Sequence, residues 1–192
     1  LVEKFMKNKN ADITLSAGNT GAMLVISRLL LNTIPGISKP ALAGLWPNKN
    51  NMNVVLDLGA NIECDEKNLI EFSEMGSALH KSLFPNEKTN VALLNVGSEE
   101  IKGSEVIKKV FQHIKKTNDK NFDFHGYIEG NHIMDGDANV IITDGFTGNI
   151  ALKTAEGTAN FITTNLKKSL TNNIFGRLSS LLSFYALKDF KN

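Results

Sequence analysis

The sequence has few of the residues that build disulfide frameworks and metal sites. It contains one cysteine, Cys64, and its four histidines show no paired-ligand spacing such as HExxH. A single cysteine excludes an internal disulfide framework and a cysteine-rich zinc site, and it fits a reducing cytoplasm. The histidine spacing likewise gives no zinc-ligand pattern. We therefore predict no metal site.

An excess of charge of one sign is also missing. Lys and Arg total 21 and Asp and Glu total 20, so the formal net charge is +1. A general nucleic-acid binder normally carries a strongly basic face, so this balance argues against nucleic acid as a partner. The length of 192 residues suits one α/β domain, residues 1–192, with a substantial core.

Long hydrophobic runs are absent as well. No apolar run approaches the ~20 residues that span a bilayer, and the run over 23–31 is interrupted by Ser27 and Arg28. No signal peptide is visible at the start. The first residues already belong to an amphipathic pattern and the last residues carry no stop signal. We therefore expect the chain to be part of a longer protein.

Four segments repeat one order: an apolar strand, a glycine-containing turn and a helix. The strands are expected at 12–16, 54–57, 91–96 and 140–143, and the helices run to Leu31, over 68–83, over 104–116 and to about Lys168. Two further strands are expected within 40–47 and 122–128. Strands that alternate with helices predict a mostly parallel sheet between two helical layers, a three-layer α/β/α fold. Right-handed crossovers would place all four turns at the carboxyl edge of the sheet, around one crevice.

The turns are rich in small polar residues that expose the backbone. They match neither a Walker A loop nor G-x-G-x-x-G. Each turn alone has a structural explanation: Asn19 or Thr20 caps a helix, loop amides satisfy Asp57, and Lys102 is either a surface lysine or a cover for a bound anion. As a set of four, the turns favour ligand binding. The candidate binding residues are Ser16, Gly18, Asn19, Thr20, Gly21, Asp57, Gly59, Asn61, Asn95, Gly97, Gly145, Thr147 and Gly148.

The fourth turn, 143–149, is the most specific. Its glycines and the helix that follows are a physical recipe for an anion site, usually a phosphate. Lys153 lies four residues after Asn149, so both share one helix face, although a surface lysine is the alternative. Asp144, Asn149 and Lys153 are the catalytic candidates, and Phe146 would wall an apolar channel or cover the crevice.

No Ser-His-Asp set or reactive-cysteine arrangement is visible in the sequence. The chemistry is therefore predicted to depend on positioning and electrostatics rather than on a covalent enzyme intermediate. A bound phosphate would itself be the nucleophile.

Beyond residue 170 the pattern changes to an amphipathic helix, expected over 170–190. Its apolar stripe has to pack on another surface, either its own domain or a dimer mate. The alternative is contact with a membrane or an acidic partner protein, because basic residues flank the stripe. The stripe consists of Ile174, Leu178, Leu181, Leu182 and Tyr185.

Taken together, four strings resemble the bacterial phosphate acyltransferase (PlsX) family of fatty acid and phospholipid synthesis. They are Ser-Ala-Gly-Asn-Thr-Gly-Ala at 16–22, Leu-Asp-Leu-Gly-Ala-Asn at 56–61, Leu-Leu-Asn-Val-Gly at 93–97 and Thr-Asp-Gly-Phe-Thr-Gly-Asn at 143–149. Their order and spacing also match and span most of the chain. Each string is weak alone, but jointly they are highly specific.

The resemblance implies transfer of an acyl group from acyl carrier protein to inorganic phosphate, giving acyl phosphate. It also implies a fold similar to phosphotransacetylases and isopropylmalate dehydrogenases, a homodimer, no metal or nicotinamide, and a cytoplasmic enzyme that works near the membrane. Two alternatives remain open: a short-chain phosphotransacetylase that uses acyl-CoA, and a non-catalytic scaffold that binds carrier protein or membrane.

The chain also departs from the family pattern. It lacks the family's N-terminal Asp-Ala-Met-Gly-Gly-Asp segment and its C-terminal Lys-x-His-Gly-like turn. At 129–132 it has Glu-Gly-Asn-His in place of the more usual Glu-Gly-Arg-Asp. We therefore expect the central and C-terminal part of a longer family domain.

Overall fold

The structure is a computed structural model that describes residues 8, 13–117, 120–172, 174, 175, 179, 182 and 183. Its contacts divide the chain into two compact units, Leu1–Ile150 and Ala151–Asn192. The predicted single domain over 1–192 stays a prediction. Most of the predicted helical extension, 170–190, lies outside the described residues.

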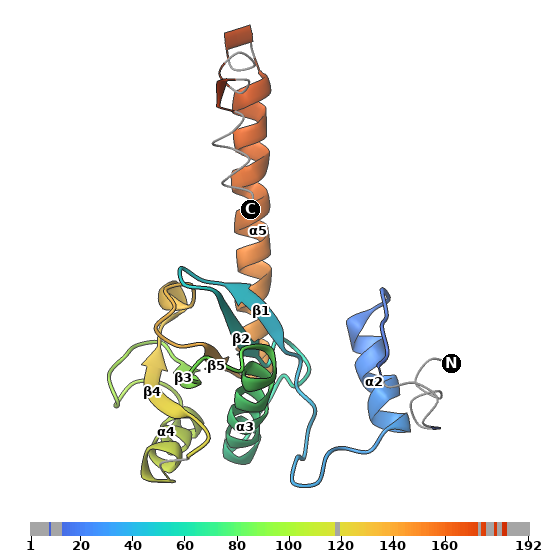
Figure 1. Cartoon of the computed structure of the whole chain (residues 1–192), viewed down its shortest axis with the longest axis vertical. Helices are drawn as coiled ribbons and strands as arrows, with labels where there is room; N and C mark the ends of the chain where they lie inside the picture. The colour runs from blue at the N-terminus through green and yellow to red at the C-terminus, as the bar shows by residue number, and fades with distance from the viewer. Residues whose placement is uncertain are drawn as a thin grey trace. The chain divides into compact units, whose positions relative to one another are not determined.

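The first unit contains a five-stranded sheet with the order β1-β2-β5-β3-β4 (Figure 1). Only β1 runs antiparallel to its neighbour; the other three pairings are parallel. The predicted α/β class with a mostly parallel sheet is therefore confirmed. The strands are β1 (Gly44–Pro47), β2 (Met52–Leu56), β3 (Asn90–Leu94), β4 (Asp123–Ile128) and β5 (Val140–Ile142).

The α-helices are α2 (Thr20–Leu30), α3 (Glu66–Leu83), α4 (Glu105–Thr117) and α5 (Gly145–Thr171). A short 3-10 helix, η1, spans Gly130–His132 and comes after β4. Three helices, α3, α4 and α5, follow β2, β3 and β5 in the expected order, whereas α2 follows no described strand.

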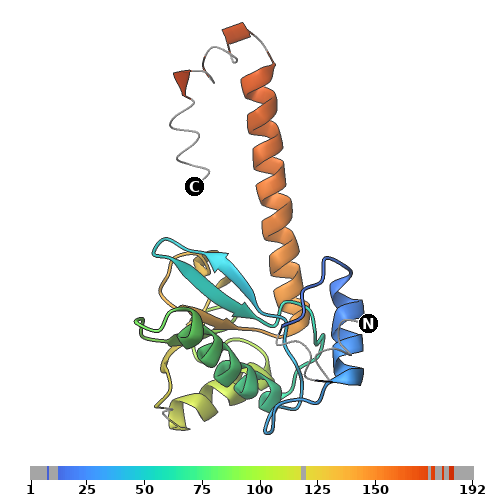
Figure 2. The ribbon, with the colours of Figure 1, turned by 45° about the vertical axis from the view of Figure 1, so that its right-hand side comes forward.

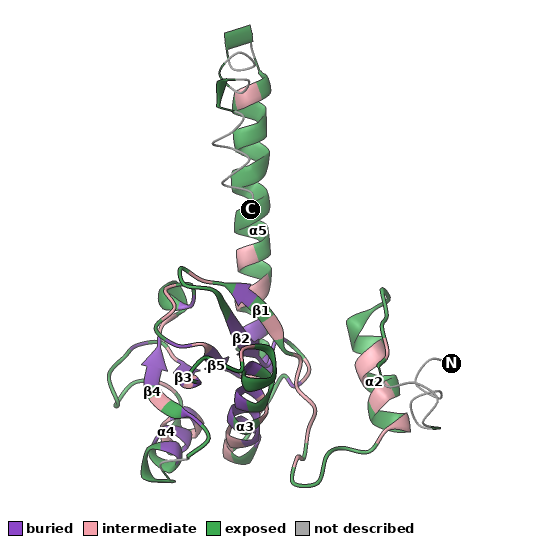
Figure 3. Cartoon of the chain, viewed as in Figure 1, coloured by how far each residue is buried: buried purple, intermediate pink, exposed green. Residues whose placement is uncertain are grey.

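Alternation along the central strands builds the core. Val54, Val91 and Val140 lie in the cluster of buried residues that also contains Leu69 and Phe72 of α3. α3 packs on β2 and β5, while α4 packs on β4 and α3, so both helices cover this face (Figures 1 and 2). The opposite face is also closed to solvent, because alternate residues on the same strands are buried (Figure 3). These residues are Val55, Ala92 and Ile141.

One predicted strand is wrong. Residues 13–16 have no regular structure, and Asp12 lies outside the described residues. Ile13 and Leu15 are 82% and 92% exposed. A β-rich sequence becomes a strand only when a neighbour supplies hydrogen bonds and a packed face, and this segment has neither. The strands expected at 54–57, 91–96, 140–143, 40–47 and 122–128 are present, within a few residues of the predicted limits.

In the second unit, α5 continues to Thr171, a few residues beyond the predicted end. From Glu156 to Ser169 every residue is exposed, including apolar Phe161, Ile162 and Leu166. In the described part of the chain, no helix combines the length and hydropathy needed to cross a bilayer.

Candidate functional site

Three of the four predicted turns meet at the carboxyl edge of the sheet. The loops 57–61, 95–103 and 143–148 follow β2, β3 and β5. Because β5 lies between β2 and β3, its loop lies between the other two. Leu56 and Leu93 both pair with Ile142, so these strands end at nearly the same level.

The first predicted turn, 16–21, makes no hydrogen bond to the other three among the described residues. The side chain of Asn19 accepts a hydrogen bond from the Ala22 amide at 3.0 Å and caps α2. Ser16 Oγ accepts from the Gly18 amide at 3.2 Å. Among the described residues, the hydrogen bonds of this turn are all local, and Thr20 and Gly21 open the helix. The observed role of Asn19 is therefore the helix cap.

Asp57 is the centre of the first loop of the edge. Its side chain is fully buried. Oδ1 accepts hydrogen bonds from the amides of Leu42, Gly59 and Ala60. Oδ2 accepts from the backbone amide and side-chain amide of Asn61, at 2.7 and 2.8 Å. With both oxygens engaged, Asp57 holds the loop in shape rather than facing a ligand.

The first turn of α5 packs directly on that loop. The Gly145 N–H donates to the Asn61 carbonyl oxygen at 2.8 Å. A methyl group on Gly145 would overlap the Asn61 backbone, and one on Gly148 would overlap the Asp57 carbonyl. These two glycines therefore permit close contact between backbones. The sequence predicts that a ligand approaches these glycines. A close backbone and a close ligand both require a residue without a side chain, so the sequence pattern is the same for the two.

Asp144 caps α5. Its Oδ1 accepts from the Thr147 amide and its Oδ2 from Thr147 Oγ1, both at 2.8 Å. Because Gly145 and Thr147 already have acceptors, Phe146 has the one amide among these three without an acceptor in the described residues. The Phe146 ring beside it is exposed. The anion-binding capacity of this helix start is therefore smaller than the sequence predicts.

Asn149 lies against Gly59, whose φ of 130° is unfavourable for other residues. A side chain on Gly59 would meet the Asn149 side chain at 3.4 Å. The Asn149 amide has no hydrogen-bond partner among the described residues and is exposed. It is therefore free to bind a ligand over the 57–61 loop.

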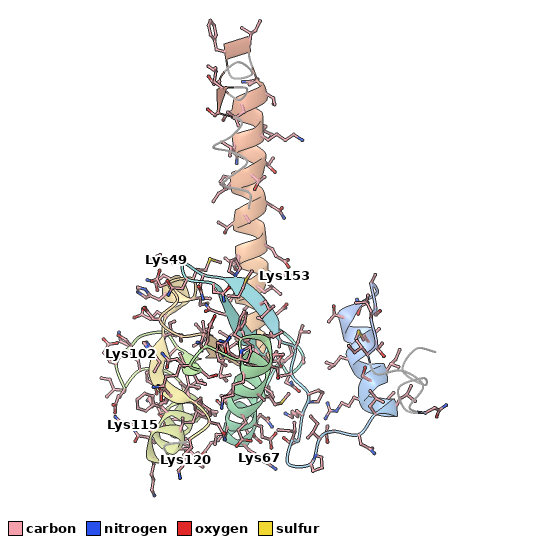
Figure 4. The ribbon with its side chains drawn as sticks, in the orientation of Figure 1. Lys49, Lys67, Lys102, Lys115, Lys120 and Lys153 are labelled. Atoms are coloured by element: carbon pink, nitrogen blue, oxygen red, sulfur yellow. The ribbon has the colours of Figure 1, made fainter. Side chains whose placement is uncertain are left out.

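The third loop is folded back on itself around Asn95. The Asn95 side-chain amide donates to the carbonyls of Gly97 and Lys102, at 3.0 and 3.1 Å. This brings the Lys102 side chain against the Cα of Gly97. The Nζ of Lys102, which is labelled in Figure 4, lies 2.9 Å from Glu99 Oε2. That bond raises the pKa of Lys102 and lowers the pKa of Glu99.

For Lys102 the sequence left two roles open, a surface lysine or a cover for a bound anion. The structure places its ammonium group beside Gly97, in an ion pair with Glu99. The available signal was the spacing of Asn95, Gly97, Lys102 and Gly103. Gly103, with a φ of 95°, lies beneath the Asn95 side chain and allows the loop to close.

Lys153 lies four residues after Asn149 on α5 (Figure 4). Its Nζ is 2.7 Å from Glu156 Oε2, and its side chain is 65% exposed. Its role in binding an anion stays a prediction.

Cys64 lies beside the Asn61 carbonyl, and burial raises the pKa of its thiol. In the described residues no cluster of three or more His, Cys, Asp or Glu side chains is arranged to hold a metal.

Among the described residues of the first unit, the edge therefore offers a cation, Lys102, a side-chain amide without a partner, Asn149, and the Phe146 N–H. Such groups bind an anion and stabilise negative charge as it develops on a reacting oxygen.

The family model described as "Fatty acid synthesis protein" matches residues 1–192. A phosphate acyltransferase of Pelagibacter ubique is 65% identical over 186 residues, covering 97% of this chain and 56% of the relative. One from Caulobacter vibrioides is 41% identical over 187 residues, covering 97% and 52%. The chain thus spans about half the length of these curated relatives.

Solved structures with a similar fold include two phosphotransacetylases. The EutD phosphotransacetylase of Staphylococcus aureus has a TM-score of 0.58, and the Streptococcus pyogenes phosphotransacetylase has one of 0.63. Both are 18% identical to this chain, covering 82% of it and 54% of the solved chain. The likeness shows a shared three-layer α/β fold.

Proposed function

This chain belongs to the fatty acid synthesis protein family, and from that premise we propose that it forms the central and C-terminal part of a phosphate acyltransferase. The proposed reaction converts acyl-[acyl carrier protein] and inorganic phosphate to acyl phosphate and free carrier protein, within fatty acid and phospholipid biosynthesis. The observation that carries the proposal is the 65% identity, over 97% of this chain, to a relative named phosphate acyltransferase.

The chemistry requires no redox step and no covalent enzyme intermediate. A phosphate oxygen attacks the thioester carbonyl carbon and forms a C–O bond. The tetrahedral intermediate then collapses, the C–S bond breaks, and the thiolate leaves and takes up a proton. Since phosphate is itself an anionic nucleophile, the protein's work is to position it and to stabilise the carbonyl oxygen as it becomes negative.

We assign phosphate to the edge formed by the loops 57–61, 95–103 and 143–148. Lys102 would exchange its ion pair with Glu99 for one with phosphate, and the Asn149 amide would donate a hydrogen bond. Asp57 acts through the loop that it holds. Lys153 remains a second candidate cation, on the evidence of its spacing from Asn149.

The proposed partners are acyl carrier protein and a second copy of the chain. The proposed location is the cytoplasm, with peripheral contact to a membrane. Apolar side chains exposed on α5 beyond Glu156 support a packing partner for that helix.

The test is turnover by the full-length protein of a long-chain acyl carrier protein thioester, with and without phosphate. Loss of thioester that depends on phosphate, together with formation of acyl phosphate, is the expected result. No phosphate-dependent loss would overturn the proposal, and binding without turnover would favour a scaffold.

A short-chain phosphotransacetylase is the second candidate, because the solved structures with this fold include phosphotransacetylases. Acetyl-CoA and a long-chain carrier-protein thioester, compared in the same assay, separate the two. A higher kcat/KM for acetyl-CoA would replace the first proposal by the second.

A further inference from the structure

An apolar cavity of about 210 Å³ lies in the first unit, between α2 and α3. Arg28 is the one charged residue of its wall, at the end of α2. The apolar residues of the wall come from α2, from the segment that follows it and from α3. They are Leu24, Leu31, Ile34, Ile37, Pro40 and Met75.

The wall of this cavity is bonded to the candidate phosphate site. The Pro40 carbonyl accepts a hydrogen bond from the Asn61 side-chain amide at 2.8 Å. Two residues further, the Leu42 amide donates to Asp57 Oδ1 at 3.0 Å, and the Leu42 carbonyl accepts from the Leu58 amide at 2.9 Å. The segment therefore runs from the cavity directly to the 57–61 loop.

The same segment is fixed on α3. Glu71 Oε2 accepts from the backbone amide and the hydroxyl of Ser38, at 2.8 and 2.6 Å. Ser38 Oγ also accepts from the Asn68 side-chain amide at 3.0 Å. Ser38 lies between Ile37 and Pro40, so this side of the cavity is held in place before any ligand arrives. A preformed wall lowers the entropic cost of binding.

We propose that the cavity takes the hydrocarbon tail of the acyl group whose thioester carbon reacts at the neighbouring edge. This inference rests on the proposed function and adds the location of the chain-binding site. The wall also includes Ser27, Asn32 and Thr33, but most of its residues are apolar. An apolar cavity of about 150 Å³ lined by aliphatic side chains binds benzene. The cavity is larger than that, and its bonded connection to Asn61 and Asp57 joins it to the reacting end.

The decisive measurement is the KM of full-length variants for carrier-protein thioesters of increasing chain length, at saturating phosphate. Each methylene buried in the cavity should lower KM about four-fold. Leu24→Gln places an amide in the wall and should flatten this dependence. Leu29→Gln makes the same change on the same helix, at a side chain that is 77% exposed and outside the wall, and should preserve the dependence.

A substitution that fills the cavity with a larger side chain also tests whether the acyl tail binds there. Ser27 belongs to the wall, so Ser27→Phe places a ring in the cavity. The KM should then stop falling at a shorter chain length, while the KM for phosphate is unchanged. Val25→Phe, on the same helix and outside the wall, is the control. Thermal unfolding of each variant checks that α2 remains folded.

The outcomes separate the two proposals. Equal chain-length dependence in Leu24→Gln, Leu29→Gln and the parent, with turnover intact, overturns the cavity as the tail site and leaves the proposed function standing. Absence of phosphate-dependent turnover with every chain length, in the parent protein, overturns the proposed function.

Discussion

The Cα of Gly148 faces the carbonyl oxygen of Asp57 so closely that a methyl group could not fit between them. Through this contact the first turn of α5 seats on the loop after β2. Gly148→Ala should destabilise the fold by about 1–3 kcal/mol, because the added methyl overpacks a rigid contact. Denaturant unfolding measures the change.

Gly157→Ala is the matched control, on the same helix. A methyl group there meets nothing within 4 Å, and alanine is favoured over glycine inside a helix by about 1 kcal/mol. The two substitutions should therefore change stability in opposite directions. Destabilisation of equal size by both would mean that the Asp57 contact is not what constrains position 148.

The buried carboxylate of Asp57 gives a second stability prediction. Asp57→Asn keeps the shape but puts an NH₂ group where one oxygen accepts hydrogen bonds, so donors face a donor. We expect a loss of about 1–3 kcal/mol in the free energy of unfolding. Asp137→Asn, at an exposed position, should change it by less than about 0.5 kcal/mol. An unchanged stability for Asp57→Asn would show that the loop does not depend on the charge.

The sheet was predictable because its central strands are buried on both faces. Val54 to Leu56, Val91 to Leu94 and Val140 to Ile142 are continuous apolar runs, as parallel strands require. Residues 13–16 alternate apolar and polar side chains, as a strand with one buried face does, but none of the described strands lies beside them. Pairing between strands is a tertiary event, which a local pattern does not contain.

The turns after β2, β3 and β5 were predicted to share one edge of the sheet, and the fold places them there. Glycine in a turn signals close approach, and the sequence does not say whether a ligand or another backbone approaches. For Gly145 and Gly148 it is the backbone of 57–61. The position of Lys102 over Gly97 could not be predicted, because it depends on a loop closed by the Asn95 amide, which no helical or strand period reveals.

His80 makes stability depend on pH. Its ring is fully buried, with Nδ1 3.1 Å from Thr89 Oγ1 and Nε2 3.6 Å from Glu87 Oε2. Burial lowers the pKa of His80, although Glu87 opposes the shift. The unfolded chain therefore binds a proton near pH 6.5 that the folded chain does not. Stability from this group should fall as the pH drops below about 6.5, by at most about 1.4 kcal/mol per pH unit.

Unfolding of the parent and of His80→Gln between neutral and mildly acidic pH measures that contribution. The variant should lose this part of the slope, whereas His113→Gln, outside the buried core, should keep it. A parent more stable at pH 5.5 than at pH 7 would indicate that the Glu87 ion pair outweighs burial.

Lys102 is the side chain that the structure places against Gly97, and Lys153 is the one that the sequence favours. If Lys102 binds phosphate, Lys102→Ala should raise the KM for phosphate about 10- to 100-fold, since a hydrogen bond to a charged group contributes about 1.5–3 kcal/mol. Lys153→Ala tests the second assignment in the same assay. Lys109→Ala, at an exposed position on α4, is the control and should leave that KM unchanged.

Glu99→Gln adds a separate check, because it removes the carboxylate that competes with phosphate for Lys102. It should lower the KM for phosphate in the parent but have no effect in Lys102→Ala. If Glu99→Gln still lowers the KM for phosphate when Lys102 is replaced by Ala, then Glu99 does not compete with phosphate for Lys102. If Lys102→Ala or Lys153→Ala leaves the KM for phosphate unchanged, that lysine does not belong to the phosphate site.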